Sequence, residues 1–133
     1  MKDANSPLAV ADRFIAALNL ADVDAIRAIY APDARIWHNF SGKEQPVEVN
    51  IKTLLWVHRV LQDVEYDVQQ RHEIPGGFVQ QHILRGRLPS GEAFAMPACV
   101  LCRVADGRIV ELEEYIDSAQ TQPLLDQSRP RGA

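Results

Sequence analysis

The amino-acid sequence predicts a single α+β domain, in which N-terminal helices pack against one face of a strongly curved antiparallel sheet. In the first half of the 133 residues, apolar side chains recur with the period of an α-helix. The second half instead carries three turn signals between long strand candidates: Pro75-Gly76-Gly77, Pro89-Ser90-Gly91 and Asp106-Gly107. Helices followed by a meander of strands are typical of the α+β class, and long strands twist into a concave sheet.

The first two predicted helices begin at clear caps. Ser6 and Pro7 combine a capping hydroxyl with a proline at the first helical position, so we expect a helix from there to about Leu20. Asp22 caps a second, shorter helix, and Pro32 ends it.

The remaining elements follow from periodicity and from the turn signals. A short strand over 34–39 and a loop over 40–46 precede a third helix over 46–62, whose apolar side chains form one stripe. Four long strands are predicted at 64–74, 78–88, 93–104 and 108–118, and a helical turn at 120–127. We assign residues 1–127 to one domain and residues 128–133 to a flexible C-terminal tail.

Charge and hydropathy argue against several classes of partner. The chain has 14 basic and 18 acidic residues, and the basic ones are scattered, so we expect no binding to nucleic acid. Nothing approaches the roughly 20 apolar residues of a membrane span, and Met1–Val10 lacks the apolar run of a signal peptide. We therefore expect a cytoplasmic protein that does not bind membranes.

The cysteine and histidine spacings predict neither a redox pair nor a metal site. Cys99 and Cys102 lie in one predicted strand, where their Cα atoms would be about 10 Å apart on opposite faces, too far for a disulfide. The four histidines do not place two metal ligands on one face of any element. A domain of this size also needs no metal to fold. We expect no metal and no cofactor.

Glu114 and His82 are the first candidates for catalytic residues. Strand alternation places Glu114 on the same face as Leu112 and Ile116, and a carboxylate in an apolar row is costly unless it is paired. Either its pKa rises or it binds a donor such as His82. Such a pair could orient a water molecule and take its proton. The alternative is that the opposite face of this strand points inward, with Glu113, Tyr115 and Asp117.

The other histidines are less distinctive. His38 and Asn39 are adjacent on a short strand, so only one of them should point inward, and the sequence leaves open which one does. His58 lies in the apolar stripe of the third helix, where a packing role is favoured over ligand contact. His72 lies beside a turn, and we expect it to be exposed.

Several short segments resemble known proteins. Arg13–Asn19, Ala21–Asp24 and Tyr30–Ala34 look like the N-terminal half of ketosteroid isomerases. Ile109–Asp117, which contains Glu113-Glu114-Tyr115-Ile116-Asp117, resembles the last strand of limonene epoxide hydrolases and SnoaL-like polyketide cyclases. Together with the order of elements, these segments indicate a resemblance to the nuclear transport factor 2-like superfamily over residues 8 to about 125. The resemblance implies a cystatin-like cone, a homodimer formed through the outer face of the sheet, and many compatible chemistries.

The resemblance also suggests which residues occupy the functional positions. The positions that match the isomerase donors and base are Phe14, Cys99 and His38. Phenylalanine donates no hydrogen bond and a thiol donates a weak one, which argues against steroid isomerisation. The positions that match the hydrolase residues are Trp37, Asn39, Gln80, His82 and Glu114. Gln80 and His82 replace an arginine and its acidic partner, which argues against limonene epoxide itself.

The sequence therefore predicts a cofactor-independent lyase, isomerase or hydrolase that acts on a small apolar molecule, cyclic molecules included. The expected catalytic residues are His82 and Glu114, with His38 or Asn39. The expected lining of an apolar cavity consists of Phe14, Tyr30, Trp37, Leu54, Leu55, His58, Gln80, Leu84, Met96, Cys99, Leu112 and Ile116. Cys102, Arg103 and Tyr115 are candidates for the dimer face. The alternative function is a non-catalytic small-molecule-binding or dimerisation domain.

Overall fold

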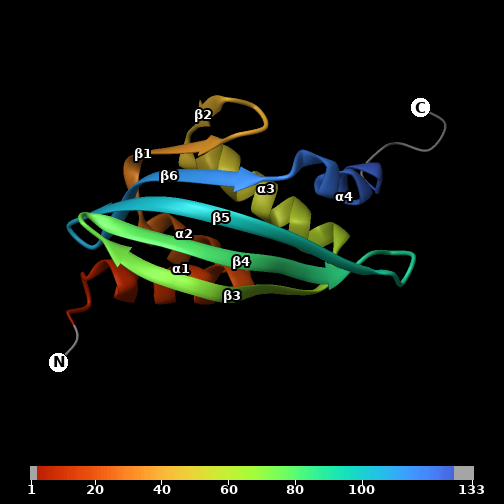
Figure 1. The fold of residues 1–133 in the computed structure, drawn as a ribbon, viewed down its shortest axis with the longest axis horizontal. Helices are drawn as coiled ribbons and strands as arrows, with labels where there is room; N and C mark the ends of the chain where they lie inside the picture. The colour runs from red at the N-terminus through yellow and green to blue at the C-terminus, as the bar shows by residue number, and fades with distance from the viewer. Residues whose placement is uncertain (1–2, 128–133) are drawn as a thin grey trace.

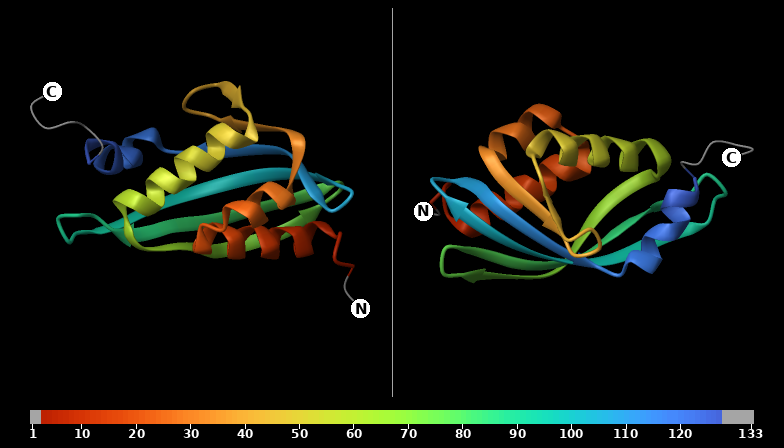
Figure 2. Two further views of the ribbon diagram at one scale, coloured as in Figure 1. Left: turned by 180° about the vertical axis from the view of Figure 1, so that it is seen from behind. Right: turned by 90° about the horizontal axis from the view of Figure 1, so that it is seen from above.

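Three helices cover one face of a six-stranded sheet, and the described residues leave the other face largely uncovered (Figures 1 and 2). The computed structural model describes residues 3–127. The helices are α1 (Pro7–Leu20), α2 (Val23–Ile29) and α3 (Val47–Val60). The strands are β1 (Tyr30–His38), β2 (Lys43–Gln45), β3 (Gln62–Ile74), β4 (Gly77–Arg87), β5 (Ala93–Ala105) and β6 (Arg108–Ile116). A 3-10 turn, η1 (Ser118–Thr121), and a short helix, α4 (Gln122–Asp126), follow.

The predicted start of α1 is confirmed in detail. The hydroxyl of Ser6 accepts a hydrogen bond from the backbone N–H of Ala9 at 3.2 Å, and Pro7 takes the first helical position. The helix ends where Ala21 adopts a left-handed conformation, with φ of 51°. Asp22 then caps α2 through the backbone N–H of Ala25 at 3.1 Å. Local capping chemistry thus positions both helices.

The predicted end of α2 is wrong by a few residues. The helix stops at Ile29, and Tyr30 already begins β1, which is therefore longer than the strand expected at 34–39. Proline disfavours the helical conformation in the residue before it, so the chain before Pro32 becomes extended. The loop expected at 40–46 also contains a short strand, β2, which pairs with the end of β1.

The sheet combines an antiparallel meander with one parallel strand. Strands β3 to β6 pair in succession, as the turn signals predict. Asp106 and Gly107 both have positive φ, 53° and 75°, as a tight hairpin turn between β5 and β6 requires. The sheet order is β2-β1-β6-β5-β4-β3, so β1 lies parallel to β6. This arrangement brings β1 beside β6, although the two strands are far apart in the chain, and the α+β cone expected from the sequence is confirmed.

Apolar side chains fill the space between helices and sheet in two clusters. One includes Phe14 of α1, Ile36 of β1 and Phe78 of β4. The other lies around Val57 near the end of α3 and includes Leu124 of α4. Of the dimer-face candidates, Cys102 is wrong, because it is completely buried in the first cluster. It faces inward because it aligns with inward-facing residues of both neighbouring strands.

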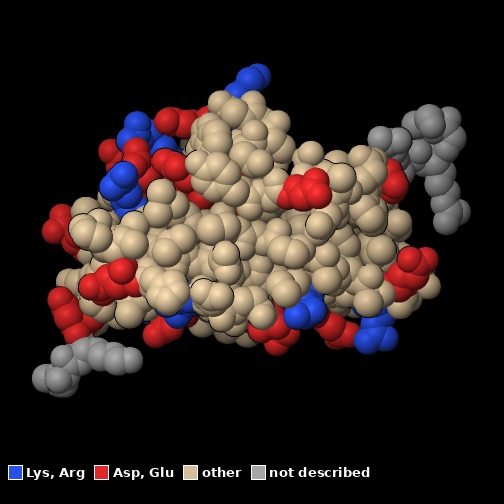
Figure 3. Space-filling model, in the orientation of Figure 1, with Lys and Arg blue, Asp and Glu red and all other residues tan. Residues whose placement is uncertain are grey.

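The uncovered face of the sheet carries few charges near its centre, while acidic and basic side chains gather along its edges (Figure 3). No helix within residues 3–127 is long and apolar enough to cross a membrane. The C-terminal tail predicted at 128–133 lies outside the described residues.

Candidate active site

His38 and Glu114 lie directly opposite each other on the parallel strands β1 and β6. The Nε2 atom of His38 is 3.1 Å from the Oε1 atom of Glu114, within salt-bridge distance. The side chains are 10% and 21% exposed, so the pair is shielded but reachable. Of the two residues between which the sequence could not choose, His38 is the one that points inward.

Asn39 instead lies outside the site and supports the sheet. It is exposed, and its side-chain amide exchanges two hydrogen bonds of 3.0 Å with the backbone of Ile116. Both ends of the amide are therefore used one residue beyond the end of β1. The side chain of Asn39 is bound to Ile116 and does not join the carboxylate of Glu114.

The face that carries Glu114 is the inner face of the sheet. Leu112 is 5% exposed on this face, whereas Tyr115 on the opposite face is 47% exposed. The strand register places Val100 beside Glu114, and Gln80 beside Val100. Glu114 thus lies in an inward-facing row that crosses the sheet, as one of the two alternatives from the sequence predicts.

His82 belongs to a chain of polar side chains that the sequence did not reveal. It is 5% exposed, and its Nδ1 atom is 3.0 Å from the amide nitrogen of Gln80. The Oε1 atom of Gln80 accepts a hydrogen bond of 2.8 Å from Arg71 on β3. Arg71 in turn binds Asp12 of α1. Among residues 3–127, no hydrogen bond joins His82 to Glu114. The charge of Glu114 acts on the ring of His82 through space.

Burial and charge shift the pKa of His82. Desolvation lowers this pKa below its ordinary value, the charge of Glu114 raises it, and Arg71 lowers it further. The net direction is downward, so the ring of His82 is neutral at neutral pH. Its edge also meets the ring of Tyr66, with a centroid distance of 5.7 Å.

The charge of Glu114 acts on several buried groups of the inner face. Burial raises the pKa of the Tyr30 and Tyr66 phenols and of the Cys102 thiol, and in each case the negative charge of Glu114 adds to the rise. Both phenols therefore keep their protons and remain hydrogen-bond donors. The hydroxyl of Tyr30 and the Nδ1 atom of His38 are buried without a partner among the described residues.

Tyr66 and Arg71 are site residues that sequence reasoning missed. Tyr66 alternates with Val64 and Val68 on β3, and this alternation was the only available signal. Nothing in the sequence indicates that Arg71 folds inward toward α1, because that depends on the packing of the helix over the sheet.

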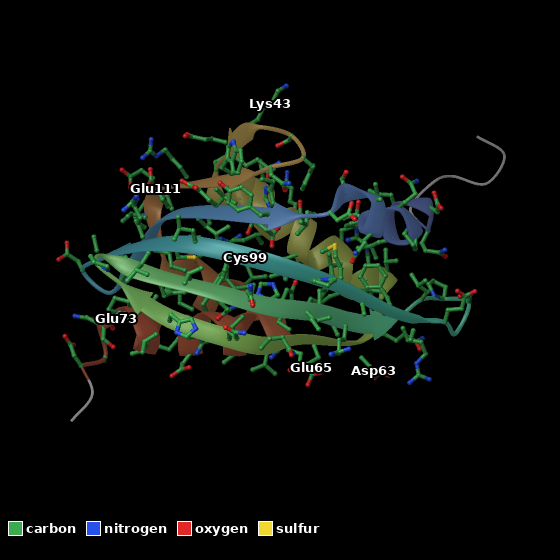
Figure 4. All side chains as sticks on the ribbon, viewed as in Figure 1. Lys43, Asp63, Glu65, Glu73, Cys99 and Glu111 are labelled. Carbon is green, nitrogen blue, oxygen red and sulfur yellow. The ribbon has the colours of Figure 1, made fainter. Side chains whose placement is uncertain are left out.

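The expected lining residues divide into two groups. Phe14, Tyr30, Leu54, Gln80, Leu84, Met96 and Leu112 are buried, and Ile116 is partly buried against the second apolar cluster. Three other residues do not join them. Leu55 is 37% exposed, Trp37 packs edge-on against Tyr115, and Cys99 aligns with Gln81 and Tyr115. Cys99 is labelled on β5 in Figure 4, which views the uncovered face.

The remaining histidines behave as the sequence predicts. The Nε2 atom of His58 is 2.8 Å from the carbonyl oxygen of Leu18, which satisfies a packing histidine between α3 and α1. His72 is exposed. Cys99 and Cys102 are free thiols. Within the described range, no three His, Cys, Asp or Glu side chains converge as metal ligands would.

Two hollows border the sheet. One of about 250 Å³ is bordered by Trp37, Glu113 and Tyr115, and another of about 510 Å³ by residues that include Gln81 and Cys99 and also reach His82. Their lining comes mainly from the uncovered side of the sheet. An apolar cavity enclosed between helices and sheet stays a prediction.

A curved six-stranded sheet with helices on one face is the fold of the nuclear transport factor 2-like superfamily. The sequence model described as the SnoaL-like domain matches residues 11–112, and the chain belongs to this family. No curated protein matches the sequence.

Solved structures agree with this fold. IdmH from Streptomyces antibioticus, a proposed polyketide cyclase, superposes with a TM-score of 0.80 at 23% identity, covering 90% of this chain and 98% of that one. A proposed SnoaL-like polyketide cyclase from Jannaschia sp. CCS1 gives 0.76 at 18% identity, covering 98% and 99%. AclR from Streptomyces galilaeus, a proposed hydroxylase, gives 0.77 at 18% identity, covering 91% and 93%. At these identities the likeness shows the fold alone.

Proposed function

We propose that the chain is a cofactor-independent lyase, isomerase or hydrolase that uses Glu114 for acid–base chemistry on a small apolar substrate. The observation that carries the proposal is the His38–Glu114 contact of 3.1 Å on the apolar inner face. We also propose that the protein is cytoplasmic and that its ligand is apolar, either cyclic or acyclic, as the sequence leads us to expect.

The arrangement divides the chemical roles between residues. The carboxylate of Glu114 accepts a proton from the substrate or from a bound water molecule, and His38 holds the carboxylate in place. The neutral ring of His82 and the protonated phenols of Tyr30 and Tyr66 supply polar contacts around it. A half-shielded site strengthens each of these interactions relative to water.

The test is a turnover assay with a panel of epoxides, enones and hydroxyketones. We expect Glu114→Gln to lower turnover of an accepted substrate by about 10²- to 10⁴-fold, the usual contribution of a positioned acid or base. Glu113→Gln is the matched control, because Glu113 is the adjacent carboxylate on the opposite face of β6 and lines a surface hollow. Equal turnover by the wild type and Glu114→Gln would remove Glu114 from the chemistry.

A non-catalytic binding or dimerisation domain is the second candidate. The uncovered face of the sheet favours it, because few charges lie near its centre (Figure 3). Tyr115 is 47% exposed and packs against Trp37. We therefore keep a homodimer through this face as a proposal. Light scattering of the wild type and of Tyr115→Asp distinguishes a dimer that this face forms from a monomer. Binding without turnover of panel compounds, unaffected by Glu114→Gln, would favour this second function.

A further inference from the structure

We propose that Asp12, Arg71 and Gln80 form a positioning relay that fixes His82 as the neutral tautomer with its proton on Nε2. His82 then presents a hydrogen-bond donor to the substrate, which must offer an acceptor oxygen at that point. The role at the site rests on the proposed function, whereas the tautomer does not depend on it.

The orientation of the Gln80 amide follows from its neighbour. A guanidinium group only donates hydrogen bonds, so the amide atom 2.8 Å from the Nε atom of Arg71 must be the oxygen. The amide nitrogen therefore faces His82 and donates to Nδ1 at 3.0 Å. An Nδ1 atom that accepts a hydrogen bond carries no proton, and the proton of the neutral ring lies on Nε2.

The relay is anchored and shielded. Gln80 is 1% exposed. A flip of its amide would place the amide N–H against the N–H of Arg71 and the amide oxygen against the unprotonated Nδ1 of His82, so both buried hydrogen bonds would be lost. The side chain of Arg71 is 17% exposed and binds both the carboxylate of Asp12 and the carbonyl oxygen of Ala11. The orientation is thus transmitted from α1 through β3 to β4.

The relay also resists protonation of His82. A proton on Nδ1 would face the amide N–H of Gln80, so two donors would oppose each other. If the amide turned so that its oxygen accepted this proton, its nitrogen would face the guanidinium of Arg71, which also only donates. The charged or titratable groups around the ring are Tyr66 and Arg71 on β3, Glu114 on β6 and Asp12 beyond Arg71 on α1. Only Glu114 and Asp12 are acidic, and Asp12 already neutralises Arg71.

The sequence suggested that a His82–Glu114 pair takes a proton from water, but this tautomer gives His82 a different role. A ring with its free proton on Nε2 has no lone pair to take a proton from water at that edge. Among residues 3–127 no hydrogen-bond partner meets this Nε2 atom, so the group is free to donate. Glu114 is left as the proton acceptor, and His82 is a donor toward a substrate oxygen.

The tautomer can be measured without a substrate. Long-range ¹H–¹⁵N spectra of the labelled chain distinguish protonated from unprotonated ring nitrogens, and His58 serves as a reference. His58 places its Nε2 atom against a carbonyl oxygen and therefore carries a proton on that atom. We expect His82 to show the same Nε2–H pattern and to titrate below the ordinary imidazole value of about 6.5.

Gln80→Glu supplies the decisive comparison. A carboxylate accepts from Arg71 and from a protonated Nδ1 at once, so we expect His82 in this variant to become doubly protonated and to titrate above the ordinary imidazole value of about 6.5. Asp12→Asn, a change at an exposed position, should shift the His82 titration weakly in the opposite direction, because Arg71 loses its counter-charge and lowers the pKa of His82 further. An Nδ1–H ring in the wild type would overturn the relay, and so would an unchanged His82 titration in a folded Gln80→Glu variant. If Gln80→Glu does not fold, the wild-type spectrum and Asp12→Asn decide alone.

Turnover of an accepted substrate tests the donor role. The amide of glutamine can donate but cannot act as a base, so we expect His82→Gln to retain at least 10-fold more turnover than His82→Ala. Equal loss in both variants would overturn the donor role, whereas the effect of Glu114→Gln tests the proposed function independently.

Discussion

The side-chain amide of Asn39 binds the backbone of Ile116 as a neighbouring strand would, accepting from its N–H and donating to its carbonyl oxygen at 3.0 Å each. The backbone N–H of Asn39 also donates to the carbonyl oxygen of Glu114, at 3.0 Å. These bonds continue the parallel pairing of β1 and β6 past the last strand residue of β1. Asn39 thereby holds His38 opposite Glu114 without entering the site.

We expect Asn39→Ala to lower the free energy of unfolding by about 1–2 kcal/mol, because two hydrogen bonds of about 1 kcal/mol each are lost and the position is exposed. Asn39→Asp keeps the acceptor but places a carboxylate oxygen against the carbonyl oxygen of Ile116, so we expect it to be destabilised at least as much. Urea unfolding measures both, with Asn50→Ala on α3 as the control. An Asn39→Ala protein as stable as the wild type would show that the amide does not hold the strand end.

Sequence patterns predicted the features that depend on residues close together in the chain, such as helix caps and tight turns. The cap at Ser6 and the Asp106-Gly107 turn follow from local spacing, and both are present. Strand alternation placed Glu114 with Leu112 and Ile116 but left open which face of the strand points inward. The partner of Glu114 was not predictable, because His38 reaches it only through the parallel pairing of strands that are far apart in the chain. A shift of one residue exchanges the two faces of a strand, so the choice between His38 and Asn39 needed that register.

Tyr30 gives a test of the unpartnered hydroxyl. The residue is 1% exposed, and its hydroxyl has no hydrogen-bond partner among the described residues. An unsatisfied buried polar group costs about 1–3 kcal/mol, so we expect Tyr30→Phe to raise the free energy of unfolding by about 1 kcal/mol. Tyr115→Phe, at an exposed position, should change it by less than about 0.5 kcal/mol. A loss of stability in Tyr30→Phe would instead reveal a bound water molecule or ligand at the hydroxyl.

The two thiols should differ in reactivity by orders of magnitude. Cys102 is completely buried, and burial raises the pKa of its thiol, so little reactive thiolate is present. Cys99 is partly exposed on the other face of β5. We expect an aromatic disulfide reagent to modify one thiol rapidly in the folded protein and the second only on unfolding. Cys99→Ser should abolish the rapid phase; two rapid thiols in the wild type would place Cys102 nearer the surface.

His82 should make stability depend on pH between neutrality and mild acid. Burial lowers its pKa in the folded protein below the unfolded value of about 6.5. Between these two values the unfolded chain binds more protons, so stability falls as the pH decreases through 6.5 toward the folded pKa. We expect His82→Gln to lose less stability than the wild type between about pH 7.5 and 5.5, as measured by urea unfolding across this range. Identical pH profiles for His82→Gln and the wild type would mean that the His82 ring binds its proton as readily in the folded chain as in the unfolded one. The pH dependence of stability would then not support a neutral His82 ring in the folded protein.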